Sequence, residues 1–216
     1  MFTLDACHLL SGLPAEEVAA VQQRGQRRRY PARALIIQEG ETGNVVFFVL
    51  EGRLRVFAAD DDGGEIVLNV LEPGSCCGEL ALLGDGVRSA SVMTLEPAVL
   101  FSLPGSELRA VFERHPAVFG RLLDLLGQRV RALSENVRSL ALDDVYVRVT
   151  RYLHEAAEVT GDGLLVAQDL TQRELASRVG ASREMVARIL RELRVGGYIS
   201  TSRGRVLIRK PLPKRF

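Results

Sequence analysis

The sequence predicts an α+β protein with a β-rich N-terminal part, one long helix, and two short C-terminal helices followed by a β-hairpin. Three observations lead to this prediction. Short apolar runs separated by glycine-rich turns occupy residues 30–105, a 3.5-residue apolar period follows Pro116, and two helix-capping patterns lie within residues 171–193. We therefore expect three segments, residues 1–115, 116–143 and 144–216.

The composition is typical of a folded globular protein, because 47% of the 216 residues are hydrophobic and 25% are charged. No apolar run approaches the roughly 20 residues that span a bilayer, and the N-terminus lacks the basic and apolar regions of a signal peptide. We expect a cytoplasmic protein without a membrane partner. Cys7, Cys76 and Cys77 have no spacing that suits a disulfide framework or a metal site, so they are expected to be reduced thiols.

The charge is unevenly distributed along the chain. Residues 168–216 carry 12 basic and 4 acidic residues, a net charge of +8, whereas residues 1–167 carry a net charge of −7. A basic end on an acidic body suits binding to a polyanion such as nucleic acid. A solvated basic face would give the same count, so the motifs must decide.

The β-rich part is predicted from six apolar runs with glycine-containing turns between them. This regular spacing is typical of an all-β sandwich or barrel, and Asp61-Asp-Gly-Gly64 is a hairpin signal. Residues 1–30 are expected to form a short helical segment, and Arg27-Arg-Arg29 a solvated run rather than a second DNA contact. The six expected strands are Ala34–Gln38, Val45–Leu50, Leu54–Ala58, Ile66–Leu71, Ala90–Thr94 and Ala98–Leu103.

The long helix carries apolar residues at alternating spacings of three and four, which is the pattern of a two-helix coiled coil. We therefore expect a homodimer; packing of this helix on its own β domain is the alternative. Leu142-Asp143-Asp144 is expected to form a hinge, with Asp144 capping the next helix. The apolar seam consists of Leu123, Leu126, Val130, Leu133, Val137 and Leu140.

Residues 171–193 have the spacing of a helix-turn-helix. Thr171 and Glu174 form a capping box, Gly180 allows a tight turn, and Ser182 caps the second helix. The residues of the second helix that are expected to face inward are Met185, Val186, Ile189, Leu190 and Leu193. The residues left to face outward are then Arg183, Glu184, Ala187, Arg188 and Arg191.

Such a polar, cationic helix fits the major groove of DNA. Arginine can bind guanine O6 and N7, and glutamate can accept from cytosine N4. Residues 196–208 read as a hairpin wing, whose Arg203 and Arg205 would meet phosphates, as would Arg209 and Lys210 beyond it. The sequence therefore predicts an interface with double-stranded DNA.

The segment Gly78–Ser91 is the second motif. A strand end leads into a short helix near Glu79, whose N–H groups can face an anion, and Arg88 offers a bidentate fork for a phosphate. Ser89 adds a hydroxyl group, and the Glu79 carboxylate could accept a sugar hydroxyl. These groups together suit a nucleotide.

Across essentially its whole length, the chain resembles the Crp/Fnr family. That resemblance implies a jelly-roll-like β-roll that binds a cyclic nucleotide, a long dimerisation helix and a winged helix-turn-helix. It implies no enzyme activity and no cofactor beyond an effector such as cyclic AMP. Carried over residue by residue, the implied ligand site comprises Gly78, Glu79, Leu80, Arg88, Ser89, Leu133 and Ser134.

The same resemblance implies the partners. Arg183, Glu184 and Arg188 match the positions that read a TGTGA-like half-site, and Thr171 and Ser182 match phosphate-contacting positions. A two-fold-symmetric DNA site, a second copy of the chain and RNA polymerase are therefore the expected partners.

Two departures from the family pattern bear on the effector. Members that respond to cyclic AMP usually carry Thr-Ser where this chain has Leu133-Ser134, so one hydrogen bond to adenine is missing. Val87 stands where many members have proline, which removes no ligand group. The first alternative is therefore a regulator that binds DNA in the same way but responds to another effector or to none. With no effector, its DNA binding would be constitutive or redox-tuned.

A metal-dependent jelly-roll enzyme is the second alternative. Such an enzyme needs clustered histidine and carboxylate ligands on its strands, and residues 30–105 contain no histidine. The sequence therefore favours a regulator over an enzyme.

Overall fold

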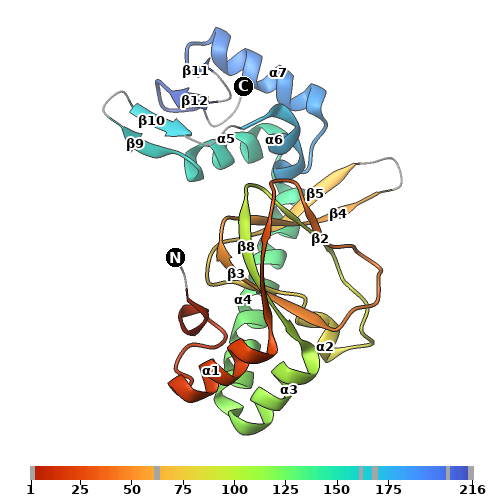
Figure 1. Ribbon diagram of the computed structural model, residues 1–216. Helices are drawn as coiled ribbons and strands as arrows, with labels where there is room; N and C mark the ends of the chain where they lie inside the picture. The colour runs from red at the N-terminus through yellow and green to blue at the C-terminus, as the bar shows by residue number, and fades with distance from the viewer. Residues whose placement is uncertain (1–2, 61–63, 161–162, 167–169, 203–204, 214–216) are drawn as a thin grey trace. The chain divides into compact units, whose positions relative to one another are not determined.

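The computed structural model describes residues 3–60, 64–160, 163–166, 170–202 and 205–213. The chain divides into two compact units, one formed by Met1–Ala58 with Leu68–Ala132 and the other by Ala59–Val67 with Leu133–Phe216 (Figure 1). The division falls inside the long helix, whose first part belongs to one unit and whose last part belongs to the other.

The first unit contains two antiparallel sheets, in the orders β1-β8-β3-β6 and β2-β7-β4-β5. All six strands expected from the sequence are present, which confirms the predicted β-rich domain. Their neighbours within each sheet are mostly distant in sequence, as in a β-roll. The strands are β1 (Gln26–Tyr30), β2 (Leu35–Ile37), β3 (Val45–Glu51), β4 (Leu54–Ala59), β5 (Glu65–Leu71), β6 (Cys76–Cys77), β7 (Ser91–Thr94) and β8 (Ala98–Pro104).

Strand β3 explains how the two layers pack. Val46, Phe48 and Leu50 lie in a core that also contains residues of the helices, whereas Val49 lies in the core between the sheets. Because successive side chains point to opposite faces, a strand buried on both faces must be apolar throughout. This requirement accounts for the unbroken Val-Val-Phe-Phe-Val-Leu run.

Helices cover the outer face of the sheet that contains β3. Leu108, Val118 and Leu122 are fully buried there, together with Val21 of the first helix. A helix between β8 and the long helix was not expected from the sequence. The elements are η1 (Leu4–Ala6), α1 (Ala15–Arg24), α2 (Leu80–Leu83), α3 (Gly105–Arg114) and α4 (Pro116–Leu142).

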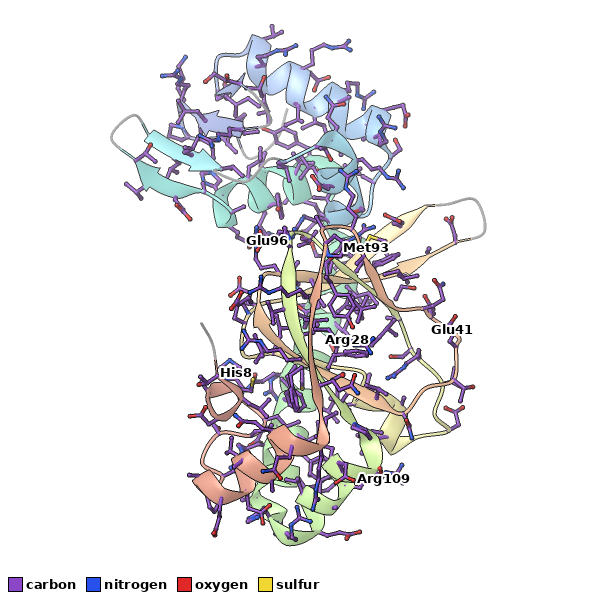
Figure 2. The ribbon with its side chains drawn as sticks, in the orientation of Figure 1. His8, Arg28, Glu41, Met93, Glu96 and Arg109 are labelled. Carbon is purple, nitrogen blue, oxygen red and sulfur yellow. The ribbon has the colours of Figure 1, made fainter. Side chains whose placement is uncertain are left out.

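The expectation that residues 1–30 are helical is wrong at its end. Helix α1 ends at Arg24, and the three arginines lie in β1, where Arg28 pairs with Leu100 of β8 (Figure 2). All three are exposed, as expected of a solvated run. Strand β1 is an edge strand, and charged side chains protect such edges from pairing with other chains.

The second unit contains three helices and a four-stranded sheet of order β11-β12-β10-β9. The helix-turn-helix and the hairpin wing are both present as the sequence predicts. The pairing of β9 with β10 was not expected, and part of the turn predicted between them lies outside the described residues. The elements are α5 (Val145–Glu155), β9 (Glu158–Thr160), β10 (Gly163–Val166), α6 (Gln172–Val179), α7 (Arg183–Val195), β11 (Ile199–Ser202) and β12 (Arg205–Ile208).

The predicted caps of α5, α6 and α7 are confirmed. Thr171 and Glu174 form the reciprocal capping box of α6, Ser182 accepts from the N–H of Met185, and Asp144 accepts from the N–H of Val147. Each cap satisfies backbone donors that the first turn of a helix leaves without a partner. These local interactions fix where α5, α6 and α7 begin.

No helix within the described residues combines the length and apolarity needed to cross a bilayer.

We predict that Gly180→Ala destabilises the second unit by about 1–3 kcal/mol in urea unfolding. Gly180 has φ +60°, and an added Cβ would lie 2.6 Å from Leu140 Cδ2. The left-handed conformation alone costs a non-glycine residue roughly 1–2 kcal/mol. Gly12, with φ +77° and no heavy atom within 4 Å of an added Cβ, provides the control. Equal losses in Gly12→Ala and Gly180→Ala would contradict the proposed clash with Leu140.

Candidate functional site

The Gly78–Ser91 segment forms a compact turn around Arg88. Gly78 has φ +86°, and a Cβ at this position would lie 2.5 Å from Arg88 Nη1. Helix α2, which follows Glu79, has only four residues, so its N-terminus contributes little to anion binding. The ability of this segment to bind an anion therefore depends chiefly on the side chain of Arg88.

Arg88 is held rigidly by main-chain acceptors. Its Nη1 and Nη2 atoms donate to the carbonyl oxygens of Gly78 and Val45, both at 2.8 Å, and the residue is 8% exposed. Burial lowers the pKa of the guanidinium, but arginine stays protonated at neutral pH. A guanidinium has five N–H donors, so Arg88 has donors left for a ligand after binding these two carbonyls.

The Glu79 carboxylate is almost completely buried, at 1% exposed. Its Oε1 atom accepts from Nη1 of Arg129 on α4, while its Oε2 atom has no hydrogen-bond partner among the described residues. The charge of Glu79 also acts on Arg88, so the two groups are neighbours, but Glu79 forms its ion pair with Arg129. A buried acceptor without a partner is costly, and a ligand hydroxyl group would satisfy it.

Arg129 is the residue of this site that the sequence did not reveal. Besides Glu79, it donates through Nη2 to the carbonyl oxygen of Cys76 at 2.7 Å. In the sequence it appears only as a charged flank of the apolar seam, 50 residues after Glu79. No local pattern connects the two residues.

The other expected ligand residues are more exposed. Leu80 and Ser89 are solvent-exposed. The loop that carries Glu41 lies beside the motif, since the backbone N–H of Arg88 donates to the Glu41 carbonyl oxygen at 2.9 Å (Figure 2). Leu133 and Ser134 are exposed on the part of α4 that belongs to the second unit. The structure thus brings Gly78, Glu79 and Arg88 together.

The cysteine thiols near this motif are poorly suited to redox sensing. Cys76 and Cys77 are buried, and burial raises the pKa of Cys77 to about 12 and that of Cys76 well above its usual value. Burial likewise raises the pKa of Cys7 to about 11. The reactive thiolate is therefore scarce at neutral pH, which argues against redox tuning.

Helix α7 exposes the residues that the sequence assigns to DNA. Arg183, Glu184, Arg188 and Arg191 are exposed, whereas Val186, Ile189 and Leu193 are buried. Met185 and Leu190, expected inside, are half-buried and pack against the same core. Thr171 and Ser182 are exposed at the starts of α6 and α7, Arg205 is exposed on β12, and Arg203 lies outside the described residues.

A groove of about 400 Å³ lies between α7 and the hairpin wing. Arg191, Arg194 and Arg205 line it with Gln172 and Thr201, and its described lining contains no carboxylate. A second hollow of about 390 Å³, on the side of α7 next to α5, contains the carboxylates of Asp144 and Glu192 besides Arg188. The wing side of α7 is therefore the better candidate site for DNA phosphate groups. Arg194, which the sequence analysis did not single out, lines this groove together with Arg191 and Arg205.

We predict that Arg129→Met destabilises the first unit by about 3–5 kcal/mol, because it leaves the Glu79 carboxylate buried without its cation. Urea unfolding of the full chain measures this loss. The double variant Arg129→Met/Glu79→Gln removes the charge as well and should recover a large part of the stability. A double variant no more stable than the single one would show that the ion pair is not the cause.

Comparisons with known proteins agree with this geometry. Residues 27–115 match the cyclic nucleotide-binding domain, and residues 147–212 match the Crp-like helix-turn-helix domain. The chain is 30% identical over 204 residues to the CRP-like cAMP-activated global transcriptional regulator of Mycobacterium tuberculosis, covering 93% of this chain and 91% of that protein. It is 33% identical over 202 residues to the cyclic AMP receptor protein of Thermus thermophilus, covering 94% and 92%.

A solved structure shares the fold along the chain. The c-di-GMP responsive global regulator CLP of Xanthomonas campestris superposes with a TM-score of 0.83 at 24% identity, covering 91% of this chain and all of that one. The matched domains, the curated relatives and the fold agree, and the chain belongs to the Crp/Fnr family of transcription regulators.

Proposed function

We propose that this regulator binds a two-fold-symmetric, TGTGA-like DNA site as a homodimer and responds to a cyclic nucleotide, such as cyclic AMP, in its β-roll. Residues 1–115 would sense the effector, residues 116–143 would dimerise, and residues 144–216 would bind DNA. The observation that carries the proposal is the exposed Arg183-Glu184-Arg188 face of α7, presented on a helix whose opposite face is buried. Such a face can reach base edges in the major groove.

The effector site is proposed at Arg88 and Glu79. Arg88 is fixed by two carbonyls and has N–H donors left for a phosphate, and Glu79 Oε2 is a buried acceptor suited to a sugar hydroxyl. Ser89 would add a hydroxyl contact, Gly78 and Leu80 would shape the turn, and Leu133 and Ser134 would meet the base.

Leu133 bears on which base the site would accept, because its side chain offers no hydrogen bond to adenine. Relatives at about 30% identity are described as activated by cyclic AMP, whereas a protein of the same fold is described as responsive to c-di-GMP. The alternative is the same DNA-binding role with another effector or none. Calorimetry with cyclic AMP and cyclic GMP would separate the two: binding of neither would favour the alternative.

The homodimer is proposed from the apolar seam of α4. A stripe of this kind is the contact surface of a two-helix coiled coil. Five of its six residues are large exposed apolar side chains: Leu123, Val130, Leu133, Val137 and Leu140.

Control by the effector would then be a two-state equilibrium of the dimer. In the binding-competent state the two recognition helices would meet successive major-groove faces about 34 Å apart. The effector can favour this state only through its preference for it, and a shift from 1:99 to 99:1 needs roughly 10⁴-fold differential affinity. RNA polymerase is the expected partner on DNA, and the cytoplasm the expected location.

An enzymatic role is the remote alternative. Among the described residues, no three His, Cys, Asp or Glu side chains are grouped as metal ligands. Metal analysis of the purified protein tests this alternative directly.

We predict that Arg88→Leu abolishes the response of DNA binding to a cyclic nucleotide, because the leucine cannot donate to the phosphate. Fluorescence anisotropy of a labelled duplex, titrated with effector, measures the response. Ser11→Ala, a change at an exposed turn outside the motif, should respond like the unaltered protein. An Arg88→Leu protein that keeps the full response would refute the phosphate role.

We predict that Arg183→Ala loses about 1–3 kcal/mol of binding free energy on the cognate half-site and relaxes its sequence preference. Arg205→Ala should instead weaken binding to all duplexes about equally and reduce the slope of log K against log salt by about one. Binding to a panel of duplexes at several salt concentrations distinguishes the two effects. An Arg183→Ala protein with unchanged preference would contradict base reading by this residue.

A further inference from the structure

The groove between α7 and the hairpin wing has cationic side chains on both of its walls. Arg191 and Arg194 belong to α7, and Arg205 belongs to β12 of the wing. All three are exposed, and none of them forms an ion pair with another residue that the structure describes. By contrast, Arg188, which lines the hollow on the α5 side, lies 4.0 Å from the Glu192 carboxylate. The wing side therefore keeps its three cations available for an anion.

A short turn holds the two walls of this groove together, and Figure 1 shows β11 beside α7. The chain reverses because Gly197 takes φ +71° and the Tyr198 N–H donates to the Leu193 carbonyl oxygen at 2.9 Å. The Tyr198 carbonyl oxygen in turn accepts from the Arg209 N–H at 2.8 Å, which ties the turn to the end of the wing. Arg194, in the last turn of α7, is therefore held at a fixed place beside the wing.

The groove lies too far along α7 to touch the bases that the start of the helix would read. Arg183 begins the helix, and Arg194 comes about three turns later, roughly 16 Å further along the axis. The major groove of B-DNA is about 12 Å wide. With the first turn of α7 at the base edges, its last turn therefore reaches the sugar-phosphate wall of the major groove.

The polar groups of the groove suit a phosphate. A guanidinium binds phosphate oxygens through two parallel N–H groups, and a groove lined by one sign of charge draws in ions of the opposite sign. Thr201 adds a hydroxyl group and Gln172 an amide group to the same lining. Side chains of these types supply most contacts to the DNA backbone.

We infer that Arg194 is a DNA-contact residue that binds a backbone phosphate bordering the half-site, with Arg191 and Arg205 beside it. This inference rests on the proposed function and adds a contact that the family resemblance does not assign. Because the phosphate is the same at every base pair, the contact adds affinity without adding sequence preference. Arg194 thus extends the footprint of each subunit beyond the bases read by the start of α7.

The test combines Arg194→Met with duplexes in which one backbone phosphate at a time is replaced by an uncharged methylphosphonate. Each duplex carries two half-sites, with the replacement at the same place in both. Fluorescence anisotropy of the full-length protein should reveal a phosphate bordering the half-site whose neutralisation weakens binding roughly tenfold per half-site. Arg194→Met should lose a similar factor on the unmodified duplex, and neutralising that phosphate should then cost it less than about twofold.

Two further readouts separate a phosphate contact from base reading. The slope of log K against log salt should fall by about one per half-site in Arg194→Met. Its preference for the cognate over a scrambled half-site should stay within about twofold of that of the unaltered protein. Arg194→Lys should restore most of the salt slope, because it carries the same charge, but only part of the affinity, because it lacks the fork of donors.

Arg178→Met is the matched control, since it removes the same charge from the same unit outside the groove. Arg178 lies on α6, where its guanidinium carbon is 5.5 Å from the Tyr152 ring centroid. The salt slope of this variant and its sensitivity to each methylphosphonate should equal those of the unaltered protein. If Arg194→Met does not fold, Arg194→Gln removes the charge in a second variant and should give the same result.

An Arg194→Met protein that keeps its affinity and salt slope would overturn the inference. So would one that loses affinity but stays sensitive to every neutralised phosphate, because its loss would then arise elsewhere. In both cases a sequence preference of the unaltered protein would still support the proposed function. An unaltered protein without any sequence preference would instead refute the proposed function and, with it, this inference.

Discussion

Arginine side chains that donate to main-chain carbonyl groups hold helix α4 along its first half and just beyond its end. Near its start, Arg121 donates to the carbonyl of Leu9 at 3.1 Å, and at its middle Arg129 donates to that of Cys76 at 2.7 Å. Beyond its end, Arg148 binds four carbonyls at once. In each unit, therefore, charged donors bind main-chain carbonyl groups, and hydrogen bonds from a charged donor are stronger than neutral ones.

The elements predicted correctly from the sequence are those specified by short-range chemistry. The starts of α5, α6 and α7 follow from Asp144, Thr171 and Ser182, whose side chains bond to N–H groups three residues away. The strands follow from apolar runs between turn residues, and Gly180 from the need for positive φ. In each case the residues that fix the element lie within one turn of each other.

What the sequence did not reveal depends on contacts between distant residues. Strand β1 contains three consecutive arginines and forms because β8, about 70 residues later, offers an edge to pair with. Arg129 reaches Glu79 only because of how α4 crosses the motif, and Arg194 lines a groove only because the wing folds beside α7. The Gly78, Glu79 and Arg88 positions were foreseeable through family resemblance; their partners were not.

The exposed apolar side of α4 has a consequence for how the molecule behaves in a cell. Five large apolar side chains between Leu123 and Leu140 face solvent in the single chain. A surface of this kind favours association, and association that occurs only in the folded state adds stability that grows with protein concentration. In the proposed homodimer, a higher concentration of the chain would raise the paired fraction and with it the stability of the fold.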